Sequence, residues 1–156
     1  MSAFMFELFA LIVSFIALGV AAWLFRWVKS QPLENERIAE IGEYIRRGAN
    51  VFLRREYTVL ARFVAVAALL IMVFLPKPIW EGNISKNILI TVSYIFGTGL
   101  SALSGKIGIM VSTIANTKAA EAARHGIKPS FMTGFRGGAV MGMAVVGTSL
   151  LGVTII

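Results

Sequence analysis

The sequence predicts an all-α integral membrane protein with four membrane-spanning helices. Of its 156 residues, 57% are hydrophobic and only 15% are charged, and the mean hydropathy is +0.78. Soluble domains carry about a quarter charged residues. The apolar residues also gather into runs long enough to cross a bilayer, which takes about 20 residues per helix. Composition and run length therefore indicate the same fold class.

The first apolar run, over residues 4–28, is expected to be a spanning helix. It has no basic segment at its start and no small-residue cleavage site near its end, so it does not resemble a signal peptide. Trp23 and Trp27, with basic residues beside them, are typical of an anchor at the membrane–water interface.

A polar segment, residues 30–58, separates the first span from the second. Its apolar residues recur at helical spacing, which predicts an amphipathic helix at the membrane surface. Ser30, just before a proline, is the expected start signal. This helix is expected to lead into a second span over residues 59–75, which Pro76 ends.

The second half of the chain predicts one long helix and one further span. No proline interrupts residues 88–124, so one helix of roughly 55 Å is expected there, longer than a bilayer core of about 30 Å. Its last turns should reach into water. The fourth span is expected over residues 135–156 and is still apolar at its end, so we expect the natural span, and the natural protein, to be longer.

The distribution of basic residues predicts the orientation. Lysine and arginine concentrate in cytoplasmic loops. They are most frequent around the first connection, next around the third and rarest around the second. Segments 29–58 and 116–134 are therefore expected to be cytoplasmic, with the N-terminus outside a cell membrane that the chain crosses several times.

The chain is basic, with 15 Lys and Arg against 8 acidic residues. These basic residues flank hydrophobic runs, and no soluble basic domain is present, so the lipid bilayer is the expected partner and nucleic acid is not. The sequence contains no Asp and no Cys. Hard cations such as Mg²⁺ need clustered carboxylates, so we expect no catalytic, cofactor-binding or metal-binding residue on this chain.

Small residues recur at steps of three and four in the third and fourth helices. Such residues let helix backbones approach closely in lipid. This favours tight helix packing over a direct ligand role. The residues of the pattern include Gly97, Ser101, Ser104, Gly105, Gly108, Ser112, Ala115 and Ala119, followed by Gly134, Gly138 and Gly142.

Lys106 is the charged residue well inside the third span. Two interpretations stay open. A charge at membrane depth can mark a functional site. Alternatively, its long side chain reaches the cytoplasmic interface and has no special role.

Three stretches together resemble the membrane-bound pyrophosphatases. The first, residues 47–57, leads into the second span, the second covers residues 96–120, and the third covers residues 135–142. Their motif residues are Gly48, Phe52, Tyr57, Gly97, Ser101, Gly105, Gly108, Asn116, Gly138 and Gly142. Departures from the family pattern are limited to Asn50, Ile109 and Lys118. The resemblance extends from about residue 42 to the end of the chain.

The resemblance implies one part of a much larger pump. Family members have about sixteen spanning helices in two rings and work as homodimers. They split pyrophosphate into two phosphates and move protons or sodium ions outward. Mg²⁺ is held by Asp-rich motifs on later, inner helices, and some members use K⁺. By this resemblance, the four helices of this chain belong to the outer ring, as an N-terminal scaffold that is inactive alone. The alternative is a complete small four-helix transporter or accessory subunit.

Overall fold

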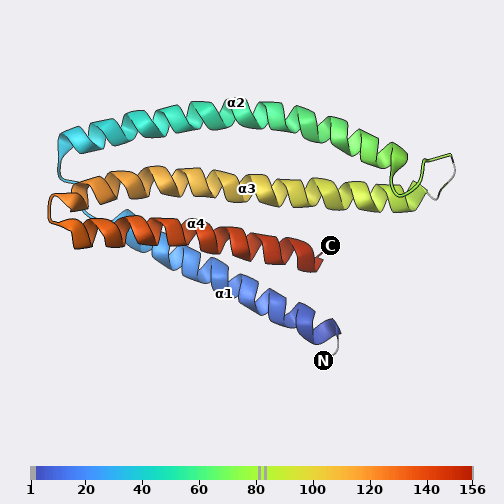
Figure 1. The fold of residues 1–156 in the computed structure, drawn as a ribbon, viewed down its shortest axis with the longest axis horizontal. Helices are drawn as coiled ribbons and strands as arrows, with labels where there is room; N and C mark the ends of the chain where they lie inside the picture. The colour runs from blue at the N-terminus through green and yellow to red at the C-terminus, as the bar shows by residue number, and fades with distance from the viewer. Residues whose placement is uncertain (1–2, 81, 83, 156) are drawn as a thin grey trace.

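The computed structural model describes residues 3–80, 82 and 84–155 and places almost all of them in four long helices (Figure 1). Each helix is long and apolar enough to cross a membrane. The predicted all-α membrane class is therefore confirmed. The helices are α1 (Ala3–Ser30), α2 (Glu36–Phe74), α3 (Ile84–Ala123) and α4 (Ile127–Ile155).

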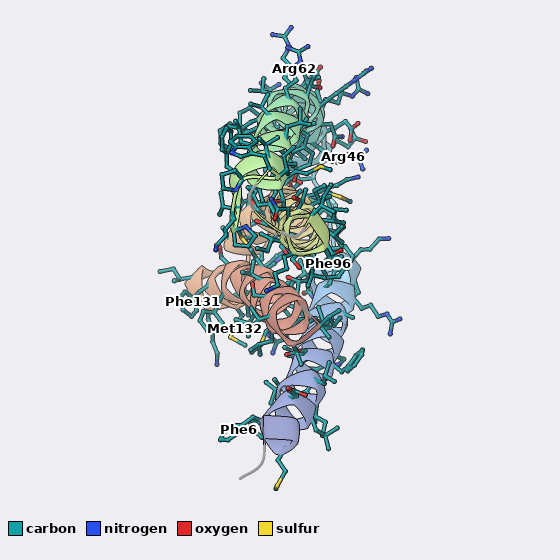
Figure 2. All side chains as sticks on the ribbon, turned by 90° about the vertical axis from the view of Figure 1, so that its right-hand side faces the viewer. Phe6, Arg46, Arg62, Phe96, Phe131 and Met132 are labelled. Carbon is teal, nitrogen blue, oxygen red and sulfur yellow. The ribbon has the colours of Figure 1, made fainter. Side chains whose placement is uncertain are left out.

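The four helices form a row in the order α2, α3, α4, α1 (Figures 1 and 2). The main packing surfaces are α3 against α4, α1 against α4 and α2 against α3, and α1 also touches α3. Within the described residues, α1 and α2 do not meet. A small core lies where α1, α3 and α4 converge, formed by Ala21, Leu24, Val111, Val140 and Ala144.

Most large apolar side chains point away from the bundle. Phe15, Phe63, Leu69 and Leu89 are each more than 60% exposed, and Figure 2 shows side chains projecting on both flanks of the row. An apolar surface this extensive would aggregate in water. In lipid it is the expected outer surface, so the exposed pattern agrees with a membrane environment.

Helix α2 differs from the predicted arrangement. The expected surface helix (30–58) and second span (59–75) are one continuous helix from Glu36 to Phe74. Its N-cap is Asn35, whose side chain accepts from the Ile38 N–H at 3.0 Å, so the expected start at Ser30 is wrong. The amphipathic part packs along α3, where Gly42 closely approaches Thr117.

The fourth helix begins at Ile127, eight residues before the expected start at 135. Gly126 has φ 123°, a left-handed conformation that favours glycine and ends α3. Pro129 then lies in the first turn of α4, where its missing N–H costs no helical hydrogen bond. The predicted loop 116–134 is therefore mostly the ends of two helices.

Candidate functional site

The end of the bundle that joins α1 to α2 and α3 to α4 contains a buried carboxylate. Glu121 of α3 is 1% exposed. Its Oε2 accepts from the backbone N–H of Asn35 at 3.1 Å, and its Oε1 pairs with Arg124 at 2.9 Å. Glu121 thus ties the connection before α2 to the end of α3. Both oxygens are used internally, so this carboxylate has a structural arrangement rather than a catalytic one.

Two further cations hold the same end together. Lys118 donates to the backbone carbonyl of Gln31. The guanidinium of Arg136 lies 3.8 Å from the ring centroid of Trp27, which joins α4 to α1 through a cation–π contact. A cavity of about 470 Å³ lies beside these contacts and is lined by Trp27, Lys118, Glu121 and their neighbours.

Removing the Glu121 carboxylate should loosen this end of the bundle. We expect Glu121→Ala to lower the free energy of unfolding by about 1.5 kcal/mol, because the Asn35 N–H loses its acceptor. The Arg124 pair adds little, since that side chain is half exposed. Titration with SDS in mixed micelles measures the change.

Glu34→Ala is the matched control for Glu121→Ala. Glu34 is exposed and has no ion pair within the described part of the chain. Equal losses from the two substitutions would show that the buried position of Glu121 has no special importance.

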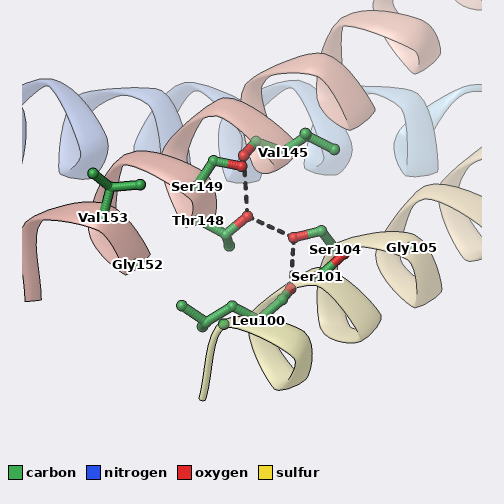
Figure 3. A pocket seen from close by; sticks show the side chains of 10 residues that line it. Leu100, Ser101, Ser104, Gly105, Val145, Thr148, Ser149, Gly152 and Val153 are labelled. Atoms are coloured by element: carbon green, nitrogen blue, oxygen red, sulfur yellow. Dashed lines mark hydrogen bonds between the residues drawn. The ribbon is translucent and has the colours of Figure 1, made fainter. Parts of the chain in front are cut away.

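A second polar feature lies in the middle of the bundle, in a groove between α3 and α4 (Figure 3). The hydroxyls of Ser104 and Thr148 are 2.5 Å apart. Ser104 also bonds to the Leu100 carbonyl at 2.9 Å, and Thr148 to the Ala144 carbonyl at 2.8 Å. The groove has a volume of about 430 Å³ and mainly apolar walls. The hydroxyls of Ser104 and Thr148 are satisfied internally, which favours helix packing over ion binding at this pair.

Three of the motif residues lie at helix contacts. The hydroxyl of Tyr57 in α2 donates to the Ala102 carbonyl of α3 at 2.7 Å. A Cβ on Gly105 would lie 3.5 Å from that hydroxyl, and one on Gly108 would crowd Met141 of α4 at 2.9 Å. These residues lie where α3 packs against α2 and α4.

The remaining motif glycines have open space where a side chain would stand. A Cβ added at Gly48, Gly97, Gly138 or Gly142 would have no atom within 4 Å. Gly97 and Ser101 line the groove between α3 and α4. The remaining motif residues are exposed: Phe52 of α2 and Asn116 of α3.

Sequence reasoning missed several residues that hold the helices together. Gly137 meets Ala115, Gly42 meets Thr117, and Gly147 meets Leu18 and the Ser14 carbonyl. Gly137 lies three residues after Gly134, a glycine of the small-residue pattern, so helical spacing could have identified it. The partner of Glu121 is 86 residues away, and no local signal identifies it.

The ion pairs described on α2 involve Glu43. Glu43 pairs with Arg46 at 2.7 Å and Arg47 at 3.0 Å. The Arg47 hydrogen bond, opposed by slight desolvation and helped by the Arg46 charge, holds the pKa of the Glu43 carboxyl below its usual value. No group of three potential metal ligands occurs within residues 3–80, 82 and 84–155. Lys106 is exposed on α3.

Comparison with known proteins identifies the family. Residues 15–156 match the family described as Inorganic H+ pyrophosphatase. The chain is 36% identical to a K⁺-stimulated pyrophosphate-energized sodium pump of Thermotoga maritima, over 93% of this chain and 19% of that protein. It is 33% identical to a K⁺-insensitive pyrophosphate-energized proton pump of Methanosarcina mazei, over 88% of this chain and 19% of that protein.

A third relative agrees with the first two. A K⁺-insensitive pyrophosphate-energized proton pump of Moorella thermoacetica is 35% identical, over 95% of this chain and 20% of its own length. The chain thus spans about a fifth of the curated relatives it matches. Four membrane-length apolar helices and these relatives show an integral membrane protein. The chain belongs to the inorganic H⁺ pyrophosphatase family, as its three ordered motifs predict.

Proposed function

We propose that this chain supplies outer, scaffolding helices to a pump that couples hydrolysis of pyrophosphate to outward movement of H⁺ or Na⁺. The family match over residues 15–156 is the main support. The contacts of Tyr57 and Gly108 add to it, because these motif residues lie where helices pack. In this proposal the chain positions other helices and does not itself touch pyrophosphate.

The donor set of the chain does not fit a Mg²⁺ site. The described residues hold no group of three His, Cys, Asp or Glu side chains, and the sequence has no Asp. Oxygen-rich carboxylate ligands are what Mg²⁺ requires. Any residues that hold Mg²⁺ or K⁺ therefore belong, in this proposal, to the rest of the pump.

The proposal includes a homodimer and a cytoplasmic location for the end containing Glu121. The surplus of Lys and Arg at that end supports the orientation, with the N-terminus outside. The chain resembles sodium and proton pumps to a similar degree. We therefore propose that it does not select the transported ion.

A chimera tests this function. Residues 1–156 replace the matching segment of the Thermotoga maritima sodium pump, and hydrolysis and Na⁺ uptake are measured in proteoliposomes. We expect the chimera to hydrolyse Mg-pyrophosphate and to transport the ion of its host, Na⁺. The chain alone should hydrolyse none.

Hydrolysis by the chain alone would contradict the scaffold role. A chimera that inserts and folds but transports H⁺ instead of Na⁺ would contradict the proposed lack of ion selection. Transport by the chain alone without pyrophosphate would favour a complete small transporter.

A further inference from the structure

Arg54 and Arg62 are among the arginines of α2 with which no acidic side chain pairs within the described residues. Arg54 and Arg62 are both exposed, and no hydrogen bond or ion pair of either side chain occurs within the described residues. Figure 2 shows Arg62 at the edge of α2 that is turned away from α3 and α4. Each arginine therefore needs a partner from outside the bundle.

The position of these arginines along α2 places them at the membrane boundary and below it. The helix runs without a break to Phe74. At 1.5 Å per residue, Arg62 is about 18 Å and Arg54 about 30 Å from that end. Since the hydrocarbon core is about 30 Å thick, Arg54 lies near the cytoplasmic boundary and Arg62 lies within the core. A charge at that depth requires an anionic or polar partner.

One face of α2 combines these charges with a shallow depression. Arg54, Thr58 and Arg62 follow one another at steps of four residues, and Tyr57, Ala61 and Ala65 complete the lining. The small alanines leave room between the arginines. Glu56 is turned about 200° away from Arg54 around the helix. This face therefore carries positive charge without an acidic residue to neutralise it.

Beyond the depression the same helix is apolar. Val66, Leu69 and Leu70 are exposed by more than half of their surface and continue toward the outer end of α2. The face thus has a cationic part near the boundary and an apolar part in the core. An anionic phospholipid has the complementary order, a phosphate at the boundary and acyl chains below it.

We propose that this face of α2 binds an anionic phospholipid of the cytoplasmic leaflet, with the lipid phosphate between Arg54 and Arg62. The Arg62 side chain extends toward the boundary to reach it, and an acyl chain lies over Ala65 and the apolar residues beyond. Free phosphate or pyrophosphate could also bind between the two arginines. Such a soluble anion has no acyl chain, so it would not make the apolar contact.

Quenching by brominated lipids tests the site. The full chain carries Leu69→Trp as reporter, with Trp23, Trp27 and Trp80 changed to Phe, in bilayer nanodiscs; Leu69 is exposed and lies one turn beyond the depression. Brominated phosphatidylglycerol is compared with brominated phosphatidylcholine at equal mole fractions. We expect a preference for phosphatidylglycerol of roughly fivefold per arginine, reduced in Arg62→Gln and absent in Arg54→Gln/Arg62→Gln.

The control removes two charges from the same helix in water. Arg46→Gln/Arg47→Gln should keep the preference, because these residues pair with Glu43 beyond the membrane. Native mass spectrometry of the chain without the reporter provides a second measurement. Bound phosphatidylglycerol should be retained by the unchanged chain and by the control pair, and lost in Arg54→Gln/Arg62→Gln.

Three results would overturn the proposal. The first is equal quenching by the two lipids in the protein that keeps Arg54 and Arg62. The second is an equal loss of preference in the control pair. The third is displacement by millimolar phosphate or pyrophosphate at matched ionic strength, which would indicate a site for a soluble anion.

Discussion

We expect Gly137→Ala to lower the free energy of unfolding by about 3 kcal/mol, because no other glycine here leaves so little space for a Cβ. An added Cβ would overlap the Cβ of Ala115 on α3. That atom is fixed to the backbone and cannot rotate away, so the two helices would have to separate. The change is measured by SDS titration in mixed micelles.

Gly138→Ala is the matched control, one residue further along the same helix. A Cβ there has no atom within 4 Å. The substitution should be neutral or stabilising by up to about 1 kcal/mol, because alanine favours helix over glycine. Equal effects at the two positions would show that α3 and α4 do not approach as described.

A second substitution tests whether steric overlap with the Ala115 Cβ causes the loss of stability in Gly137→Ala. Ala115→Gly alone should cost about 1 kcal/mol of helix propensity. Combined with Gly137→Ala it should restore most of the loss, because the nearest remaining atom, the Ala115 Cα, lies 3.7 Å from the new Cβ. A coupling of about 3 kcal/mol in this double-mutant cycle is the expected signature of direct contact.

The second large effect is expected at the loop end of the α2–α3 hairpin. Asn87 is 1% exposed, and its Nδ2 donates to the carbonyls of Met72 at 2.9 Å and Lys77 at 2.8 Å. The helical partner of the Met72 carbonyl would be the N–H of residue 76, but Pro76 has none. Asn87 therefore replaces a bond that proline removes.

Asn87→Leu should lower the free energy of unfolding by about 2–3 kcal/mol, because the carbonyls of Met72 and Lys77 lose the donor that the buried Asn87 side chain supplies. Asn87→Asp keeps the side-chain shape but offers no N–H, so we expect a loss at least as large. The same SDS titration measures both substitutions.

Asn50→Leu provides the control for Asn87. It is the same change at an exposed position on α2, where we expect less than about 0.5 kcal/mol. If Asn87→Asp were neutral, the hydrogen bonds would not be the reason for the position of Asn87.

The sequence predicted the helices more reliably than their ends. Long apolar runs without proline predicted the third helix almost as observed, since lipid forces the backbone to satisfy its own hydrogen bonds. The errors came at polar segments. Residues 36–58 have the pattern of a surface helix, but α3 lies beside them and offers Gly42 and Leu53 a packing surface.

Contacts were harder to predict than helices. The small-residue pattern predicted tight helix packing, and Gly105 and Gly108 do lie at contacts, with α2 and α4 respectively. It did not separate Gly137, which meets Ala115, from Gly138, which meets nothing. Helical spacing defines only a broad face of one helix. Which residue on that face makes contact depends on the angle at which the two helices cross, and the side chains of both helices set that angle.

The sequence by itself determined the membrane class, the family and the absence of an Asp-based site, because each depends on composition or on the order of residues along the chain. The tertiary structure alone decided which glycines carry contacts, that Glu121 is buried against Asn35, and that Arg54 and Arg62 share an outward face. These features depend on distances between helices, and such distances are set only when the helices pack together.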